Sequence, residues 1–196
     1  MIRTFVFLGL ASLLVGCGSK IAKDSGPTAP SVPAGWAVAD LKGVPFTLAL
    51  PAELEPEVLS AADLQKSQPS STGRIAENGL LAKSKTGELD RAVVGFELVA
   101  DREITIDDST KDFEAGLESS GVKVENFEET TVRLPVGSAK QLTATVEIGG
   151  RKGQMAYFVY VEGRSIYHIG IMDFPAQKDT GLLAQAIADS FRPRKS

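Results

Sequence analysis

The chain has 196 residues, of which 43% are hydrophobic and 23% charged, and its formal net charge is −4. This length suits one domain large enough to bury a full core, and the mild acidity excludes a general attraction for nucleic acid, whose phosphates require clustered Lys and Arg. The single cysteine excludes an internal disulfide, so in an oxidising compartment the fold must depend on packing alone.

The first 16 residues have the pattern of an export signal. Arg3 gives the segment a positive start, and residues 5–14 are almost entirely apolar. An apolar stretch this short is typical of a secretory signal core, because a membrane-spanning helix needs about 20 residues. The sequence therefore predicts a signal peptide over residues 1–16, with cleavage before Cys17.

The residues around Cys17 resemble the bacterial lipoprotein motif. Leu14 lies three positions before the cysteine, Gly16 directly precedes it, and Gly18-Ser19 follow. The resemblance implies a diacylglycerol thioether on Cys17 and anchoring to the membrane by two or three acyl chains, each buried methylene contributing about 0.8 kcal/mol. In a Gram-negative cell, the absence of aspartate after the cysteine favours the outer membrane. The alternative is an ordinary signal peptide cut elsewhere, with Cys17 incidental.

Residues 17–34 are expected to form the lipidated end and a flexible linker. Pro27, Pro30 and Pro33 recur at a spacing of three, and the segment has no hydrophobic period. Such a segment cannot bury enough apolar area to order itself, and as a coil it spans roughly 20–25 Å. We expect one folded domain over residues 35–194.

The first half of this domain mixes strands with short helices. Alternating apolar residues predict strands over 44–50 and 92–100, and a further strand is expected over 74–84. Pro45 has no N–H to donate, which indicates an edge strand or the start of a strand. A short helix is expected over 57–66.

A second helix is predicted to run as far as residue 120. Asp107 or Asp108 can cap its first turn, and Gly121 can supply the left-handed residue that ends it. Its apolar face is thin, consisting mainly of Phe113 and Leu117. We therefore expect this helix to lie on a sheet.

The second half is expected to be an antiparallel meander closed by a helix. Strands are predicted over 122–134, 140–148, 154–161 and 164–172, and the helix over 179–190. The third and fourth of these strands are apolar on both faces, so both faces must be covered. The apolar stripe expected to supply part of that cover is Leu182, Leu183, Ala186, Ile187 and Phe191.

These patterns together predict an α+β fold. Its expected form is an antiparallel sheet of about five to seven strands with helices on both faces, which is an α/β/α sandwich. A strand ending in proline (46–51), the late meander and a closing helix that runs into Ser190-Phe191 resemble the sandwich shared by PsbP, an extrinsic subunit of photosystem II, and the Ran-binding Mog proteins. The resemblance implies action by binding other proteins, and it carries over no site residues and no cofactor.

Candidate catalytic and metal-binding residues are few. His168 is the only histidine and lies within a predicted central strand, where a structural role is expected; no acidic partners are placed by spacing to complete a metal site. No nucleophile motif is present. The acidic pairs Asp107-Asp108 and Glu128-Glu129 are interpreted as solvated charges, because neighbours on a strand face opposite ways.

Two basic segments are also interpreted as structural. Residues 149–153 are rich in glycine and contain Arg151 and Lys152, so they could bind a phosphate, but a phosphate-loop motif and a following helix are missing. A hairpin turn is therefore expected there. The tail with Arg192, Arg194 and Lys195 is too short to indicate nucleic-acid binding and is interpreted as a solubilising end.

The sequence favours a membrane-anchored, non-enzymatic lipoprotein of the bacterial cell envelope that binds a protein partner. It predicts no cofactor, no metal and no catalytic residue. The alternative is a membrane-tethered carrier or sensor of a small ligand, which requires a cavity beside His168, Tyr157 or Tyr167. An enzyme is the third interpretation.

Overall fold

The computed structural model describes residues 32–67, 75–84, 90–119 and 121–194. The predicted signal peptide, Cys17 and nearly all of the linker lie outside these ranges. The elements, in chain order, are β1 (Trp36–Ala39), β2 (Phe46–Pro51), β3 (Leu54–Leu59), α1 (Ala61–Ser67), β4 (Ile75–Ala76), β5 (Gly79–Ser84), β6 (Asp90–Val99), α2 (Ile106–Ser119), β7 (Lys123–Leu134), β8 (Gly137–Ile148), β9 (Arg151–Glu162), β10 (Ser165–Phe174), α3 (Thr180–Ser190) and β11 (Arg192–Pro193).

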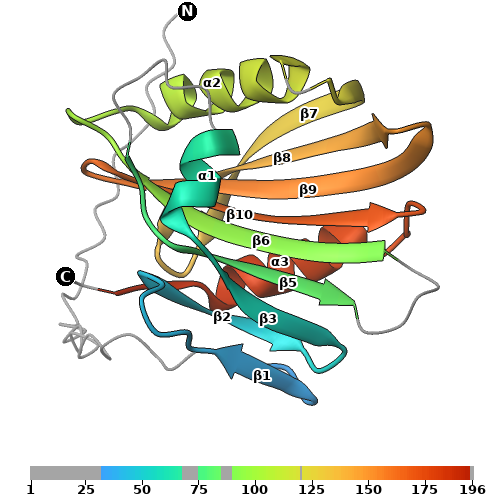
Figure 1. Ribbon diagram of the computed structural model, residues 1–196, viewed down its shortest axis with the longest axis horizontal. Coiled ribbons are helices and arrows are strands. Elements are labelled where there is room, and N and C mark those ends of the chain that lie inside the picture. The colour runs from blue at the N-terminus through green and yellow to red at the C-terminus, as the bar shows by residue number, and fades with distance from the viewer. Residues whose placement is uncertain (1–31, 68–74, 85–89, 120, 195–196) are drawn as a thin grey trace, which may run out of the picture.

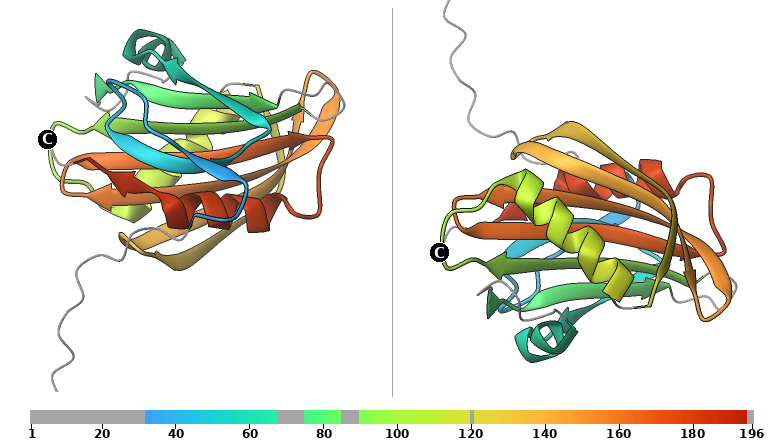
Figure 2. Two further views of the ribbon diagram at one scale, coloured as in Figure 1. Left: turned by 90° about the horizontal axis from the view of Figure 1, so that it is seen from below. Right: turned by 90° about the horizontal axis from the view of Figure 1, so that it is seen from above.

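The strands form two antiparallel sheets (Figure 1). The large sheet has eight strands, in the order β3-β5-β6-β10-β9-β8-β7, with β4 paired to β6; the small sheet has the order β1-β2-β11. The described part of the chain thus contains more strands than the expected five to seven. Figure 2 shows that the long strands of the large sheet are curved.

The large sheet buries apolar side chains on both faces, as the pattern of its last two strands predicts. Phe158, Tyr160 and Ile169 belong to one buried cluster, while Tyr157 and Ile166 belong to the other. Because successive side chains of a strand point to opposite faces, the two clusters lie on opposite sides of one sheet. β10, the strand that contains His168, lies in the middle of that sheet between β6 and β9.

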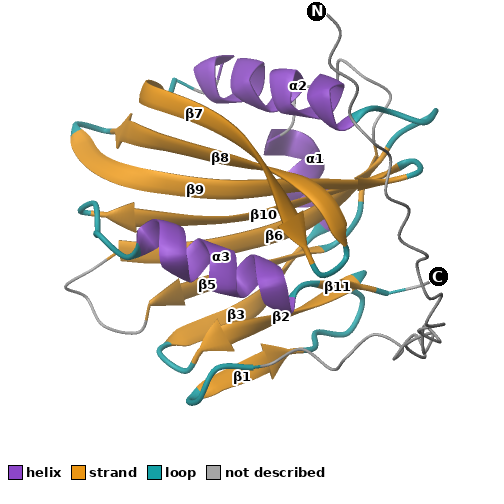
Figure 3. Ribbon diagram, turned by 180° about the vertical axis from the view of Figure 1, so that it is seen from behind, coloured by secondary structure: helices purple, strands orange, loops and turns teal. Residues whose placement is uncertain are grey.

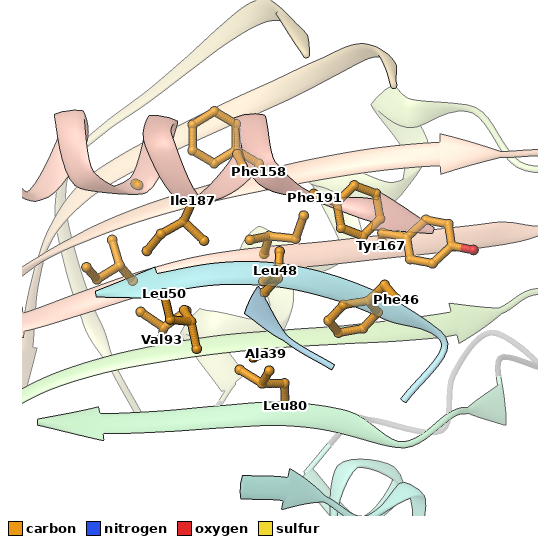
Figure 4. Packing of buried hydrophobic residues seen from close by; sticks show 14 of the residues in the cluster. Ala39, Phe46, Leu48, Leu50, Leu80, Val93, Phe158, Tyr167, Ile187 and Phe191 are labelled. Carbon is orange, nitrogen blue, oxygen red and sulfur yellow. The ribbon is translucent and has the colours of Figure 1, made fainter. Parts of the chain in front are cut away.

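The two faces are covered differently. On one face, α3 and the small sheet supply the cover: Figure 4 shows Ile187 and Phe191 packed among Phe46 and Leu48 of β2. On the other face, Phe113 and Leu117 of α2 pack against the second cluster, and Figure 3 shows α2 and α3 in separate places on the sheet. The expectation of helices over both faces is not supported, because a second sheet supplies much of one layer and the domain is rich in strand.

The segment after β2 departs from the expected short helix over 57–66. Residues 54–59 form β3, and α1 begins only at Ala61. β3 is an edge strand that pairs with β5 alone, and Pro56 is tolerated there because an edge strand can leave one row of N–H positions unpaired. Glu55, Glu57 and Val58 of β3 are exposed.

The predicted second helix is confirmed as α2, but its cap lies two or three residues earlier than expected. The Thr105 Oγ1 accepts a hydrogen bond from the Asp108 backbone N–H at 3.2 Å and donates one to Asp108 Oδ2 at 2.7 Å. Thr105 is therefore the capping residue, and the Asp108 carboxylate accepts a hydrogen bond from its hydroxyl in return. Gly121 follows the helix with φ of +78°, as its predicted stop requires.

The closing helix is also confirmed, as α3, but its apolar stripe is partly misassigned. Leu182 is 78% exposed, whereas Thr180, Ala184 and Ala188 are buried with Ile187. Small residues face the sheet because α3 must approach the β9 and β10 backbones closely. None of the helices within residues 32–67, 75–84, 90–119 and 121–194 is long and apolar enough to span a membrane.

Candidate functional site: a hollow at the start of α2

A hollow of about 500 Å³ opens to solvent beside the start of α2. Its walls come from the loop between β6 and α2, from the start of β8, and from the hairpin that joins β9 to β10. In Figure 1 this loop and this hairpin lie together at the left edge of the domain. The lining residues are Glu103, Ile104, Ile106, Ser138, Val161 and Gly163.

Lys140 fixes the start of α2 against the sheet. Its Nζ lies 3.1 Å from Asp107 Oδ1 on α2 and 2.5 Å from Glu129 Oε1 on β7, and its side chain is only 17% exposed. Hydrogen bonds to Glu129 and Asp107 raise the pKa of Lys140. Since Lys140 and Ser138 are two residues apart on β8, they share a face of the sheet, and the ion pairs hold the wall that contains Ser138.

The opposite wall is held by main-chain contacts and packing. The backbone N–H of Ala100 donates to the carbonyl oxygen of Arg164 at 2.9 Å, which ties the end of β6 to the β9–β10 hairpin. Ile104 and Ile106 are half-buried and pack against the cluster on the α2 face of the sheet, as Val161 does. The hollow therefore has three aliphatic lining residues, and its walls are fixed to the sheet.

The rim of the hollow is acidic. Residues 101–108 and 162–164 contain five acidic side chains and two arginines. Asp107 is neutralised by Lys140, whereas Glu103 makes no salt bridge to any other residue that the structure describes. An exposed carboxylate without a salt bridge, in one lining with aliphatic side chains, favours a cationic group with an aliphatic stem.

His168 does not contribute to this hollow. Its ring stacks on Phe96, with centroids 4.7 Å apart, and on Phe113 of α2, with centroids 5.5 Å apart. The side chain is buried within the α2 face of the sheet. Among the described residues, no group of three or more His, Cys, Asp or Glu side chains is positioned to hold a metal ion.

The residues beside which a ligand cavity was expected, His168, Tyr157 or Tyr167, lie on two different faces of the sheet. Tyr157 is buried on the same face as His168, where its ring packs on Phe113 with centroids 4.8 Å apart, and burial raises its pKa. Tyr167 lies on the opposite face, between Phe46 and Phe191. Burial is also the main reason that the pKa of Tyr167 is raised to about 12.

Glu97 is a buried acid that the sequence analysis did not single out. It lies on β6 directly opposite Tyr167 of β10 and is 6% exposed. Hydrogen bonds to Ser165 and Tyr167 favour its charged form, but burial outweighs them, so the pKa of Glu97 is raised. The sequence feature that could have indicated Glu97 is a single charged residue within an otherwise apolar strand pattern.

An ion pair that the sequence did not predict lies at the other end of β6. Arg91 binds the fully buried Asp173 of β10, and the hydrogen bond between them raises the pKa of Arg91. Thr180, the first residue of α3, donates a hydrogen bond to Asp173 Oδ2 at 2.6 Å. This group fixes the start of α3 on the sheet and is structural.

The remaining sequence candidates are exposed or engaged in ion pairs. The acidic pairs at 107–108, on α2, and at 128–129, on β7, are exposed. Gly149 and Gly150, with φ of +58° and +78°, form the expected hairpin turn, and β9 begins at Arg151. Arg151 pairs with Asp90, Lys152 with Glu125, and Arg194 with Asp40; Lys195 lies outside the described residues.

Comparisons with known proteins give structural likenesses only. No protein-family model matches the sequence, and no curated protein matches it. The domain is similar to the solution structure of cyanobacterial PsbP (CyanoP) from Synechocystis sp. PCC 6803, at 14% identity and a TM-score of 0.47, over 92% of this chain and 98% of that chain. It is also similar to LpqN, involved in cell envelope biogenesis of Mycobacterium tuberculosis, at 13% identity and a TM-score of 0.37, over 72% of this chain and 85% of that chain.

The first of these structures is of the PsbP type that the sequence resembles. At such low identities and TM-scores, neither likeness carries an argument about function. The functional interpretation therefore depends on the residues of this chain.

Proposed function

We propose that this protein is a lipid-anchored lipoprotein of the bacterial cell envelope whose domain binds a protein partner and catalyses no reaction. The observation that carries the proposal is the motif Leu14-Val15-Gly16-Cys17 at the end of a short apolar segment. In a Gram-negative host, Gly18 and Ser19 favour the outer membrane. The linker then holds the domain clear of the lipid headgroups, where a second protein can reach it.

The use of charged residues in the domain supports a binding role over catalysis. Exposed lysines pair with acids on neighbouring strands, as Lys83 does with Glu57 and Lys123 with Glu147. The Arg91–Asp173 pair fixes α3. These groups are engaged in holding elements together, whereas a catalytic site needs titratable groups that converge on a shared open space.

The hollow at the start of α2 is the observation that favours the alternative, a tethered carrier or sensor. Its volume lies within the range of small-ligand sites, about 300–1,000 Å³. Such sites, however, bury most of the ligand surface, about 70–90%, and this hollow is wide open to solvent. Its shape fits part of a larger molecule better than an enclosed small one.

The anchor is tested by feeding labelled palmitate to the native host. We expect label on the protein, and we expect Cys17→Ala to abolish the label and release the protein from the membrane fraction. Val15→Leu, a change at a neighbouring position that conserves apolar character, is the matched control and should keep the label. Label that survives Cys17→Ala would contradict the proposal.

The partner is tested by cross-linking in intact cells, followed by purification from native membranes at natural abundance. The proposal predicts one protein recovered in fixed ratio with this chain. The same partner should be recovered at a lower yield from Cys17→Ala cells, because the anchor keeps the two proteins in one compartment. Repeated recovery of this chain alone would count against a binding role.

A further inference from the structure

The hollow beside α2 has the chemistry of a receptor for one kind of side chain. Three of its lining residues are aliphatic, namely Ile104, Ile106 and Val161, and one, Glu103, carries a carboxylate. Ser138 and Gly163 complete the lining. A lysine or arginine side chain matches both parts, because its methylene stem is apolar and its end is positively charged.

We propose that this hollow is the docking point for a basic side chain presented by the protein partner. This inference rests on the proposed binding function and names the chemistry of its partner: a surface segment with a lysine or arginine at its centre. Charge complementarity supports it, since acidic residues outnumber basic ones in the segments that form the rim. Asp107 is neutralised by Lys140, and Glu103 is the acid among the lining residues, so Glu103 is the group that meets the cation.

The openness of the hollow argues for a partner's side chain over a free small molecule. A side chain that belongs to a larger surface does not need to be enclosed, because the surrounding contact area excludes water from it. The fixed walls, held by Lys140 and by the Ala100–Arg164 hydrogen bond, mean that little ordering is required on binding.

The first test is a titration of the isotope-labelled full chain in detergent micelles, followed by NMR. The probe is N-acetyl-lysine methylamide, and the matched controls are the norleucine and glutamate derivatives, which have no positive charge. We expect saturable shifts of the Ile104, Ile106 and Gly163 amides with the lysine probe only, at a Kd of about 1–10 mM. Glu103→Gln should weaken binding about three- to five-fold, and Glu53→Gln, an exposed acid in the turn between β2 and β3, should not.

Several results of this titration would overturn the inference. They are no saturable shift with the lysine probe, an equal response to the norleucine probe, and micromolar binding of the free lysine derivative, which would mark a small-ligand site. Ser138→Trp, a change at an exposed position that fills the hollow, should abolish the response while the rest of the spectrum is retained. A full response in that variant would also contradict the inference.

A second experiment separates failure of this inference from failure of the proposed function. A photo-crosslinking residue is placed at Arg102, which is exposed and adjoins Glu103, and in separate strains at Leu182 and Val58, which are exposed on other surfaces. The inference predicts a crosslink to one protein from Arg102 that Glu103→Lys removes. Crosslinks from Leu182 or Val58 alone would contradict the hollow as the docking point but would agree with the binding function. The absence of a crosslink from every position would contradict both the docking point and the binding function.

Discussion

Arg91 holds the fully buried carboxylate of Asp173 by two parallel hydrogen bonds, from Nε to Oδ1 at 2.7 Å and from Nη2 to Oδ2 at 2.9 Å. Asp173 also accepts a hydrogen bond from Thr180 at the start of α3. One carboxylate thus connects β6, β10 and α3, and α3 in turn covers the core that contains Phe158 and Phe191.

Arg91→Ala should be strongly destabilising. The substitution leaves Asp173 charged, buried and without its cation, and loss of one partner of such a pair costs about 3–5 kcal/mol. Lys83→Ala is the matched control, because its pair with Glu57 is exposed and worth about 0–1 kcal/mol. Urea unfolding of each variant measures the free energy of unfolding, and equal losses would contradict a structural role for the Arg91–Asp173 pair.

Gly170→Ala should destabilise the α2 face of the sheet. A Cβ at this position would lie 2.2 Å from the ring of Tyr157, so the ring would have to move. Overpacking of this kind costs about 1–3 kcal/mol. Tyr157→Leu should recover part of that loss in the double variant, as a thermal unfolding series can show.

Gly116→Ala is the control for Gly170→Ala, because it should raise the free energy of unfolding where Gly170→Ala lowers it. Gly116 lies inside α2, and a Cβ there would meet nothing within 4 Å. Alanine should therefore stabilise the helix by up to about 1 kcal/mol. A loss of stability in this variant would contradict the open space beside Gly116.

Glu97 should make stability depend on pH. Because burial raises the pKa of Glu97, the folded protein binds its proton more tightly than the unfolded chain, whose glutamate pKa is about 4.3. Its contribution to stability is therefore complete below the unfolded pKa and is lost as pH rises through the raised folded pKa. Glu97→Gln keeps polar partners for Ser165 and Tyr167 but cannot ionise.

The stability of Glu97→Gln relative to the wild type should thus increase as the pH rises above the unfolded glutamate pKa of about 4.3. Urea unfolding followed by the fluorescence of Trp36 at several pH values measures the difference. A constant difference for Glu97→Gln would mean that Glu97 titrates alike in the folded and unfolded states.

The sequence predicts most of the long elements because their periods are clear. The strand over 92–100 and the meander after 122 appear as β6 to β10, and the double-sided apolar pattern of 154–161 correctly places that strand inside the sheet. β3 was missed because Leu54–Leu59 has a proline, four exposed positions in a row and no regular alternation. Its strand conformation comes from pairing with β5, a long-range contact that local sequence does not encode.

The site was harder to predict than the fold. Glu103, Ser138 and Val161 come from three separate segments, and only the packed sheet brings them together. Leu182 was expected in the core because leucine fits an apolar stripe, but the close approach of α3 to β9 and β10 selects small residues there. His168 and Tyr167 are neighbours in sequence and for that reason face opposite sides of β10.

The most direct test of the account is the intact mass of the protein isolated from its own host. The account predicts a chain that begins at Cys17 and carries the added mass of a diacylglycerol group, with or without a third acyl chain on the amine. A chain that still begins at Met1, or one with an unmodified Cys17 thiol, would contradict it.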